Sequence, residues 1–571
     1  MDFSFDFGQI YLVVLCGALA LPLLLVGCRF VVLLAEPHLR AWVAQFNYAK
    51  PRLGGIGPRV SGSQLSILLL YLAINGVLLG VGIDTLLELE RRAAAIASAN
   101  LMLVFLGGRT NPLADFMQIP LASYYFGHRW IGIVATCEAL LHSGLALSRR
   151  QKQDASLVQS GYILAAGGLL AVIVLSVWFR RLFGRFFGLF HLLCSMGALG
   201  GLVWHVCVQR SAGPRIPVFV SCALLGSTHA FRLARMFIVG RTEGVLVQPW
   251  DDGNIIRLRV ATNKPVGVFP GCYFYVFFPG PLPFYDLFHG YAMMPAWNEP
   301  EHNVNGKTSS LTFLISRTQG QHCRSLGSTL LNQRIRLDGP YGRSLQVHTF
   351  ETVVLTAKGL GICGVLPIAL HLAARRQHDD RLRDKSARLR DSSDPVFGDL
   401  SRNVDLIWWL EHDDQDRWVG DQLRALQAID KKFLVVWCVY PVKRNPERKL
   451  PFQENEYWER KYSFDFSEFS RELRQEARYP GQTVVVASGD EKFVNSMREM
   501  VIQNTTSSRI IKFTDLEYRT PQGGFRSSFH RPLDAQALVH SDNPGSPVDQ
   551  GAELGEMDVT EGFTHKIREI V

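Results

Sequence analysis

The sequence is short of charge, and acidic residues are especially scarce in its first half. Of 571 residues, 19% are charged, against roughly 25% in an ordinary globular chain. Residues 1–240 hold 19 basic and 9 acidic residues, whereas residues 241–571 hold 41 and 42. The formal charge of +9 therefore belongs to the first half. This excludes a single soluble globule, a fully disordered chain and a nucleic-acid binder with a basic domain. Sparse positive charge between apolar runs is typical of loops that face an anionic membrane surface.

Cysteine pairs are missing as well. The chain has 10 cysteines, and none of them forms a C-x-x-C motif. This argues against a disulfide framework and against a zinc ribbon, and buried free thiols are the simpler interpretation. Six of the cysteines fall in apolar runs: Cys16, Cys28, Cys137, Cys194, Cys207 and Cys222.

Long apolar runs are what the first half has instead. A helix that spans a bilayer needs about 20 mostly apolar residues, and the sequence offers seven candidates, of which the third is short. They are Ile10–Leu34, Gln64–Ile83, Ala93–Gly107, Leu121–Leu147, Gly161–Phe179, Phe186–Val208 and Ile216–Val239. The first has an acidic leader and is not a cleavable signal. Basic loops after the first and fifth spans predict an outside N-terminus and a cytoplasmic second half, although the basic loop after the fourth span runs against this orientation.

Four histidines occupy two of these runs. His128 and His142 lie in the fourth span, His191 and His205 in the sixth, and each pair is 14 residues apart. Fourteen helical residues make almost four turns, so the members of a pair share one face about 21 Å apart. With one span between them the two helices run in the same direction, so His128 can face His191 and His142 can face His205. Facing imidazoles suit the two axial positions of a haem iron. The alternatives are histidines bonded to neighbouring helices and, less favoured, a zinc or proton-relay site.

Glu138 lies one turn before His142 on the same helix face. It can accept the second ring N–H of His142 and so raise the basicity of that ring. It can equally bond another helix, and both alternatives stay open. His229, in the last span, is interpreted as a structural histidine.

The two histidine helices resemble a known superfamily. FGHRWIGIVATCEALLHSG is similar to the first haem helix of the ferric reductase and NADPH oxidase superfamily, and FRRLFGRFFGLFHLLCSMGALGGLVWH to the second. The later segments are most similar to fungal ferric-chelate reductases, and the resemblance covers about residues 100–520. It implies that His128, His142, His191 and His205 bind two b-type haems, with no catalytic residue beyond the cofactors.

The second half has the pattern of a soluble module. IIRLRV, CYFYVFF, LTFLIS and RIRLDG, separated by turn residues, predict a β-barrel domain over 241–345. The apolar strands VVLTA, VDLIWWL, FLVVWCVY and TVVVAS predict a doubly wound α/β domain over 346–520. Within it, the charge-rich segment 375–403 is expected to be a solvated loop. Residues 1–90 are assigned to N-terminal transmembrane helices, 91–240 to the haem domain, and 521–571 to a disordered tail.

A glycine turn marks the α/β domain. Gly359, Gly361 and Gly364 follow a strand and open a helix with G-x-G-x-x-G spacing. Such a turn lets backbone amides approach a dinucleotide pyrophosphate; a tight turn without a ligand is the alternative. A barrel followed by this domain resembles the ferredoxin–NADP reductase module, and LDGPYG is similar to its interdomain turn. The resemblance places Ser488 and Gly489 near the nicotinamide, where Ser488 replaces the usual cysteine and Asp490 the usual proline.

The flavin signature of that module is altered here. The family's His-Pro-Phe corresponds to Tyr291, Ala292 and Met293, and its Gly-x-Thr reads Gly320-Gln321-His322. Binding of FAD is therefore expected from the architecture more than from these residues.

The resemblance implies an integral, multi-pass plasma-membrane protein with a cytoplasmic reductase module. Electrons from NADPH would pass through FAD and two haems to an extracellular ferric chelate, with cupric ion as a further acceptor. The choice of NADPH over NADH comes from the family alone. Expected partners are membrane lipid and the acceptor, and no nucleic acid. Two alternatives remain: a superoxide-generating NADPH oxidase, and a haem-binding membrane protein whose reductase half has decayed.

Overall fold

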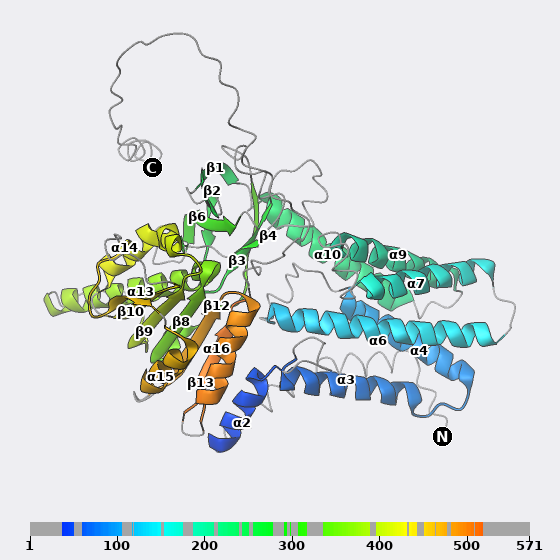
Figure 1. Ribbon diagram of the computed structural model, residues 1–571. Coiled ribbons are helices and arrows are strands. Elements are labelled where there is room, and N and C mark those ends of the chain that lie inside the picture. The colour runs from blue at the N-terminus through cyan, green and yellow to red at the C-terminus, as the bar shows by residue number, and fades with distance from the viewer. Residues whose placement is uncertain are drawn as a thin grey trace, which may run out of the picture. The chain divides into compact units, whose positions relative to one another are not determined.

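The structure is a computed structural model that describes residues 37–517 with gaps, the longest being 106–116, 175–186, 278–290 and 317–334 (Figure 1). The predicted first span, 10–34, and the predicted tail, 521–571, lie outside the described residues. The chain divides into two units, Met1–Gly523 and Gly524–Val571, and all the elements described below belong to the first.

The first half of the described chain is helical. Two of its helices begin with side-chain caps. Ser61 and Gln64 form a capping box before α3, and the Thr85 hydroxyl accepts a hydrogen bond from the Glu88 amide before α4. The helices are α2 (Pro37–Tyr48), α3 (Gly62–Gly80), α4 (Leu86–Val104), α6 (Leu121–Ser148), α7 (Ala155–Val174), α9 (Phe187–Val208) and α10 (Arg215–Ile238).

Small residues bring the helices of the bundle close together. A Cβ on Gly167 of α7 would lie 2.8 Å from the Ala198 amide nitrogen of α9, and a Cβ on Gly201 of α9 would lie 2.9 Å from the Leu164 nitrogen. Glycine at these positions lets the backbones approach without a clash, as in many membrane helix pairs. Figure 1 shows α7 beside α9 and α6 beside α4, so the two histidine helices each have a close neighbour.

Five of the seven predicted spans are helices long and apolar enough to cross a membrane, among the described residues. They correspond to the second, fourth, fifth, sixth and seventh candidates. The third coincides with α4, whose first turns carry Glu88, Glu90, Arg91 and Arg92 and lower its hydropathy. Ala93, Ile96 and Ala97 of α4 are buried. The number of seven spans thus stays a prediction.

Two antiparallel sheets follow the bundle, as predicted for a barrel. The first has the strand order β1-β2-β6-β5 and the second the order β4-β3-β7. Buried apolar side chains of β2, β3, β6 and β7 form a common core that includes Leu258, Phe274 and Phe313. The strands are β1 (Thr242–Pro249), β2 (Ile255–Gly267), β3 (Tyr273–Phe277), β4 (Tyr291–Met293), β5 (Trp297–Asn298), β6 (Lys307–Ser316) and β7 (Arg336–Tyr341).

A six-stranded parallel sheet completes the body, with the order β11-β10-β9-β8-β12-β13. The order reverses between β8 and β12, which is where ligands bind in open α/β sheets. The strands are β8 (Thr352–Lys358), β9 (Asn403–Trp409), β10 (Leu434–Tyr440), β11 (Trp458–Tyr462), β12 (Thr483–Ser488) and β13 (Ile511–Asp515). The helices are α13 (Ile362–Arg388), α14 (Gly420–Ile429), α15 (Phe466–Glu476) and α16 (Glu491–Asn504), with short turns η3 (Val347–Thr349), η4 (Gly359–Gly361) and η5 (Asp413–Val419).

The predicted fold class, a helical membrane bundle followed by a barrel and a doubly wound α/β domain, is confirmed.

The prediction of a solvated loop over 375–403 is wrong for the first half of that segment, because α13 continues to Arg388. Beyond the helix, the chain returns to it: Arg375 donates two hydrogen bonds to Asp399, and its guanidinium lies 4.0 Å from the Phe397 ring centroid. The charges that predicted a loop belong largely to a half-exposed helix.

Candidate functional site

The structure brings the four histidines together in two facing pairs. The ring centroids of His128 and His191 lie 6.3 Å apart with an interplanar angle of 80°. Those of His142 and His205 lie 6.2 Å apart at 83°. The pairing therefore follows the same levels that the 14-residue spacing predicts, with one imidazole of each pair from α6 and one from α9.

This spacing fits a metal ion between the rings. A metal–imidazole bond of about 2.0–2.1 Å on each side, plus the distance of about 1.1 Å from the nitrogen to the ring centre, places two coaxial centroids roughly 6.3 Å apart. Edge-to-face packing of two rings also gives centroid distances of about 4.5–7 Å, so the haem assignment draws on the repetition of the pair at two levels as well as on the distance. Two imidazoles at this spacing suit the axial positions of a haem, whereas no cluster of three or more His, Cys, Asp or Glu occurs in the described part of the chain.

Hydrogen bonds on the far side of the rings orient them. The Nδ1 atom of His142 lies 3.1 Å from the Glu90 carbonyl oxygen on α4, and that of His191 lies 3.1 Å from the Ala171 carbonyl oxygen on α7. His205 Nδ1 lies 3.3 Å from the Leu157 carbonyl oxygen. Because a carbonyl only accepts, Nδ1 carries the proton in these rings, which leaves Nε2 as the basic nitrogen for a metal.

His205 has a second partner and His128 differs from the others. The Ser160 hydroxyl lies 3.1 Å from His205 Nδ1 and donates its own proton to the Leu157 carbonyl. For His128, the neighbouring backbone carbonyl is that of Val104 at the end of α4, and its contact with the ring falls outside ordinary hydrogen-bond geometry. Its ring instead stacks on Tyr124, 6.3 Å away at 25°. Sequence reasoning missed these carbonyl partners, since a backbone oxygen leaves no signature in a sequence.

Glu138 takes the other of its two predicted roles. Its Oε2 accepts a hydrogen bond of 2.9 Å from Asn100 on α4, and Asn100 donates another to Asn75 on α3. The Glu90 carbonyl, not Glu138, is the partner of His142. Glu138 is buried, and its role beside the histidine pairs is that of a polar link between three helices.

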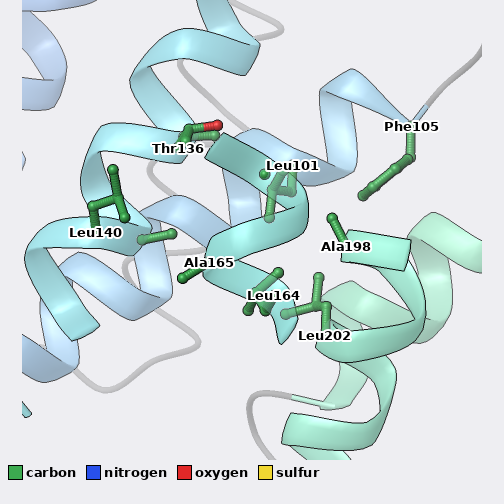
Figure 2. Close-up of a pocket in the computed structure, with 11 residues that line it drawn as sticks. Leu101, Phe105, Thr136, Leu140, Leu164, Ala165, Ala198 and Leu202 are labelled. Carbon is green, nitrogen blue, oxygen red and sulfur yellow. The ribbon is translucent and has the colours of Figure 1, made fainter. Parts of the chain in front are cut away.

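An apolar pocket lies between the two histidine levels (Figure 2). Its lining comes from α4, α6, α7 and α9, at positions between His128 and His142 on α6 and between His191 and His205 on α9. The single hydroxyl that Figure 2 labels there, that of Thr136, donates to the Gly132 carbonyl of its own helix. The space thus offers apolar surface rather than polar ligands. The lining residues are Leu101, Phe105, Ala135, Thr136, Ala139, Leu140, Leu164, Ala165, Gly168, Ala198 and Leu202.

The second candidate site lies at the carboxyl edge of the parallel sheet. Gly359 follows β8 with a φ of +52°, a backbone conformation that favours glycine. A Cβ on Gly361 would lie 2.1 Å from the Ser488 carbonyl oxygen, so the glycine turn packs directly on the end of β12. The structure therefore brings together the two segments that the sequence assigned to NAD(P), with Gly364 in the first turn of α13. Packing alone already requires glycine at 361.

Charged side chains border this turn. The Lys358 ammonium lies 3.0 Å from Asp490 Oδ2 and 3.7 Å from Glu411 Oε1. Burial opposes ionisation of Asp490, but hydrogen bonds from the Phe493 amide and from Lys358 outweigh it and lower the pKa of this carboxyl. Glu411 stands next to Gly359: a Cβ there would lie 2.6 Å from its Oε2. A carboxylate at the end of the strand next to the glycine turn is typical of sites that bind an unphosphorylated ribose. The sequence analysis did not single out Glu411.

The predicted flavin residues lie on β4, which pairs with β3. Tyr291, Ala292 and Met293 stand opposite Val276, Tyr275 and Phe274. Their side chains and Gly320-Gln321-His322 lie outside the described residues. Their assignment to FAD stays a prediction.

Residues 93–202 match the family described as "Ferric reductase like transmembrane component". This stretch includes His128, His142 and His191 and ends three residues before His205. The chain is 24% identical over 315 residues to ferric reductase transmembrane component 5 of Saccharomyces cerevisiae, covering 52% of this chain and 42% of that protein. It is 22% identical over 361 residues to ferric/cupric reductase transmembrane component 2 of the same organism, covering 58% and 48%.

The chain thus spans about half the length of the curated relatives that it matches. Among solved structures, it is similar to a ferredoxin NADP+ reductase from Neisseria gonorrhoeae with bound FAD and NADP, at 12% identity and a TM-score of 0.33, covering 48% of this chain and 97% of that one. A flavohemoglobin from Malassezia yamatoensis matches at 12% identity and a TM-score of 0.34, covering 79% and 98%. The fold assignment rests on the strand order described above. The resemblance to the ferric reductase superfamily is confirmed by the family match and the yeast relatives.

Proposed function

We propose that this chain carries electrons across a membrane, from NAD(P)H bound at the glycine turn to an acceptor on the opposite side. The observation that carries this proposal is the pair of facing imidazoles at each of two levels, with ring spacings of 6.3 and 6.2 Å. His128 and His191 would hold one b-type haem, and His142 and His205 the other. When bound, haem supplies an iron that takes up and releases single electrons, and FAD divides the two electrons of a hydride into single steps.

The residues of the chain prepare the histidine sites. The carbonyl oxygens of Glu90, Ala171 and Leu157 hold the Nδ1 protons of three rings, so the Nε2 atoms of these rings carry no proton and can bind a metal. A ring held in this way loses little freedom when it binds iron. The pocket between the levels is lined almost entirely by apolar side chains, which offer no polar ligand. These features favour haem binding over a purely structural role of the four histidines.

At the sheet edge, the glycine turn and the first amides of α13 form a place for a dinucleotide pyrophosphate. Lys358 partly offsets the negative charge of Glu411 and Asp490 there. The family resemblance implies NADPH, whereas the Glu411 carboxylate favours the unphosphorylated ribose of NADH. FAD would bind the barrel, as the architecture suggests.

We infer that the acceptor is a ferric chelate, with cupric ion as a second substrate. The printed names of the yeast relatives, a ferric and a ferric/cupric reductase component, support this choice. The loop charges support a cytoplasmic reductase module, and the family resemblance supports a plasma-membrane location. The test is the reduction of a ferric chelate by intact cells that express the chain, with superoxide dismutase present. Continued reduction is expected; reduction that disappears with the dismutase would instead assign the chain as an NADPH oxidase.

The alternative of a decayed reductase half has its own support. Ser488 and Asp490 depart from the reductase pattern, and the glycine at 361 is explained by packing. Purified full-length chain, reconstituted with haem and FAD, separates the two. Reduction of the haem absorbance by NADH or NADPH supports electron transfer. A haem that responds to dithionite and to neither nucleotide supports the decayed form.

A further inference from the structure

A fully buried carboxylate joins the last membrane helix to the barrel. Asp338 lies on β7, and its side chain is 0% exposed. Its Oδ2 accepts a hydrogen bond of 2.8 Å from Arg232 Nε, and its Oδ1 accepts one of 2.6 Å from Arg235 Nη2. Both arginines belong to the final turns of α10. One carboxylate of the soluble module is thus held by two cations of the membrane bundle.

The third donor comes from the barrel itself. The Tyr341 hydroxyl donates to Asp338 Oδ1 at 2.8 Å. Burial, and then the neighbouring Asp338 carboxylate, raise the pKa of Tyr341, so the hydroxyl keeps its proton. The Arg235 guanidinium also lies 4.4 Å from the centre of the Tyr341 ring. Asp338 therefore has three donors and no contact with water.

Apolar contacts surround this cluster on both sides. Met236 of α10 is 1% exposed and belongs to the same core as Tyr273 of the barrel and Val353 of the parallel sheet. At the next residue, the Phe237 ring receives the Arg336 guanidinium of β7 at 4.5 Å. The end of α10 is thus part of the core of the reductase module rather than a free linker.

Asp338 lies directly before the turn that connects the barrel to the parallel sheet. This turn is Gly339-Pro340-Tyr341-Gly342. Gly339 and Gly342 have φ values of +152° and +102°, and a Cβ on Gly339 would lie 2.7 Å from the Phe274 ring. The turn has little freedom to move against the barrel. Asp338 therefore joins the membrane helix to the barrel strand that leads into the nucleotide-binding domain.

We propose that Asp338 is a positioning residue that, through Arg232 and Arg235, docks the reductase module on the last membrane helix and sets the rate of electron passage between them. This rests on the proposed function. The rate of electron transfer falls as the distance between donor and acceptor grows, so a looser contact between the two domains slows it. A contact that removes freedom between donor and acceptor domains acts on that step and leaves earlier steps unchanged.

The test compares Asp338→Asn with Asp379→Asn in the full-length chain. Asp379 is a matched control, since it is also buried and accepts hydrogen bonds from the Phe397 and Gly398 amides, but within the nucleotide-binding domain. Two rates are measured with NADH and NADPH: reduction of ferricyanide, which the flavin reduces directly, and reduction of the haem absorbance. For Asp338→Asn, haem reduction is expected to slow roughly tenfold or more, with ferricyanide reduction within about twofold of the parent. An unchanged haem rate, or an equal loss of both rates, would overturn the proposal.

A second pair of variants guards against a simple folding defect. If the ion pair is the docking contact, Asp338→Asn combined with Arg235→Gln slows haem reduction no more than Asp338→Asn alone, because the two residues act as one unit. If the double variant instead slows haem reduction by the product of the two single effects, the two residues act independently, and the docking contact is contradicted. Tyr341→Phe, which removes a hydrogen bond and no charge, is expected to have a smaller effect than Asp338→Asn.

Amide hydrogen exchange reports docking without any cofactor. Exchange in segments 232–238 and 336–341 is expected to rise roughly tenfold in Asp338→Asn and to stay at the parent value in Asp379→Asn. Unchanged exchange in both segments would overturn the docking role. If the parent chain shows no haem reduction by either nucleotide, the proposed function fails, and this exchange measurement still decides whether Asp338 docks the module.

Discussion

The membrane bundle and the carboxyl edge of the parallel sheet place their functional residues under different constraints. In the bundle polar groups are few, and each histidine has a defined neighbour: another imidazole on one side and, in three cases, a carbonyl oxygen on the other. At the sheet edge, Lys358 has two carboxylate neighbours. Gly361 is required by its approach to Ser488.

This difference decides how much each feature says about function. A histidine inside a membrane helix is costly unless it binds something, and each of these four imidazoles lies opposite a second imidazole from another helix. A glycine at a strand-to-helix turn has a structural explanation before any ligand is considered. The histidine pairs are therefore strong evidence for a cofactor, whereas the glycine turn needs experiment to make it a nucleotide site.

Loss of one histidine is expected to have the largest effect. His191→Ala removes one side of the pair with His128, and a haem with a single axial ligand is bound far less tightly. Haem content should fall by half, and reduction of an external ferric chelate should fall at least about 100-fold. His229→Ala is the control, since the His229 ring bonds the Leu225 carbonyl of its own helix. Unchanged haem content in His191→Ala contradicts the ligand assignment.

The second-largest effect is expected from adding a methyl group to the glycine turn. In Gly361→Ala, the new Cβ would lie 2.1 Å from the Ser488 carbonyl oxygen, so β8 and β12 must separate. Overpacking of this kind costs about 1–3 kcal/mol of unfolding free energy, which urea unfolding of the α/β domain would reveal. Gly267→Ala in β2, where nothing lies within 4 Å, serves as the control. Equal stability of both variants would show that the turn adapts.

A smaller effect is expected at the pair of His142 and His205. Ser160→Ala removes the hydroxyl that lies 3.1 Å from His205 Nδ1 and leaves the Leu157 carbonyl in place. Haem affinity at that level should fall about tenfold, the lower end for a lost partner of a metal-bound imidazole. Haem dissociation to apomyoglobin measures it. Ser143→Ala, whose hydroxyl bonds the Ala139 carbonyl of its own helix, should leave dissociation unchanged; a matching loss there would argue against a specific role of Ser160.

The smallest effect concerns the choice of nucleotide. In Glu411→Gln, a negative charge beside Gly359 disappears, which favours the more negative NADPH over NADH. The ratio of kcat/KM for NADPH to that for NADH should rise about threefold, in line with the 0.2–1 kcal/mol of exposed charge interactions. Glu459→Gln, on β11 and similarly exposed, should leave the ratio constant. A ratio that moves equally in both variants would place the ribose elsewhere.

The parts of the fold that follow a period could be predicted from the sequence. The 14-residue spacing aligns His128 with His142 and His191 with His205 because an α-helix repeats every 3.6 residues. The buried parallel strands were recognisable because both faces of such a sheet are apolar. The extent of α13 was not, since the charges after Arg375 suit a solvated loop and an exposed helix equally.

Contacts between elements could not be predicted in the same way. Whether Glu138 bonds His142 or another helix depends on the rotation of α4, which decides that Asn100 reaches Glu138 and that the Glu90 carbonyl reaches His142. The contact of Glu411 with the glycine turn depends on how two neighbouring strands of one sheet end. The contact of Asp338 with two arginines 103 and 106 residues away depends on the packing of α10 against the barrel. Neither leaves a local pattern in the sequence.

Haem content of the purified full-length chain, measured for the parent and for single alanine variants of the four histidines, tests the assignment of the two imidazole pairs. Two haems per parent chain are expected, and each variant should lose one of them. His128→Ala and His191→Ala should remove the same haem, and His142→Ala and His205→Ala the other, as two distinguishable spectra. A parent chain without haem, or variants whose losses pair in any other way, would contradict the assignment.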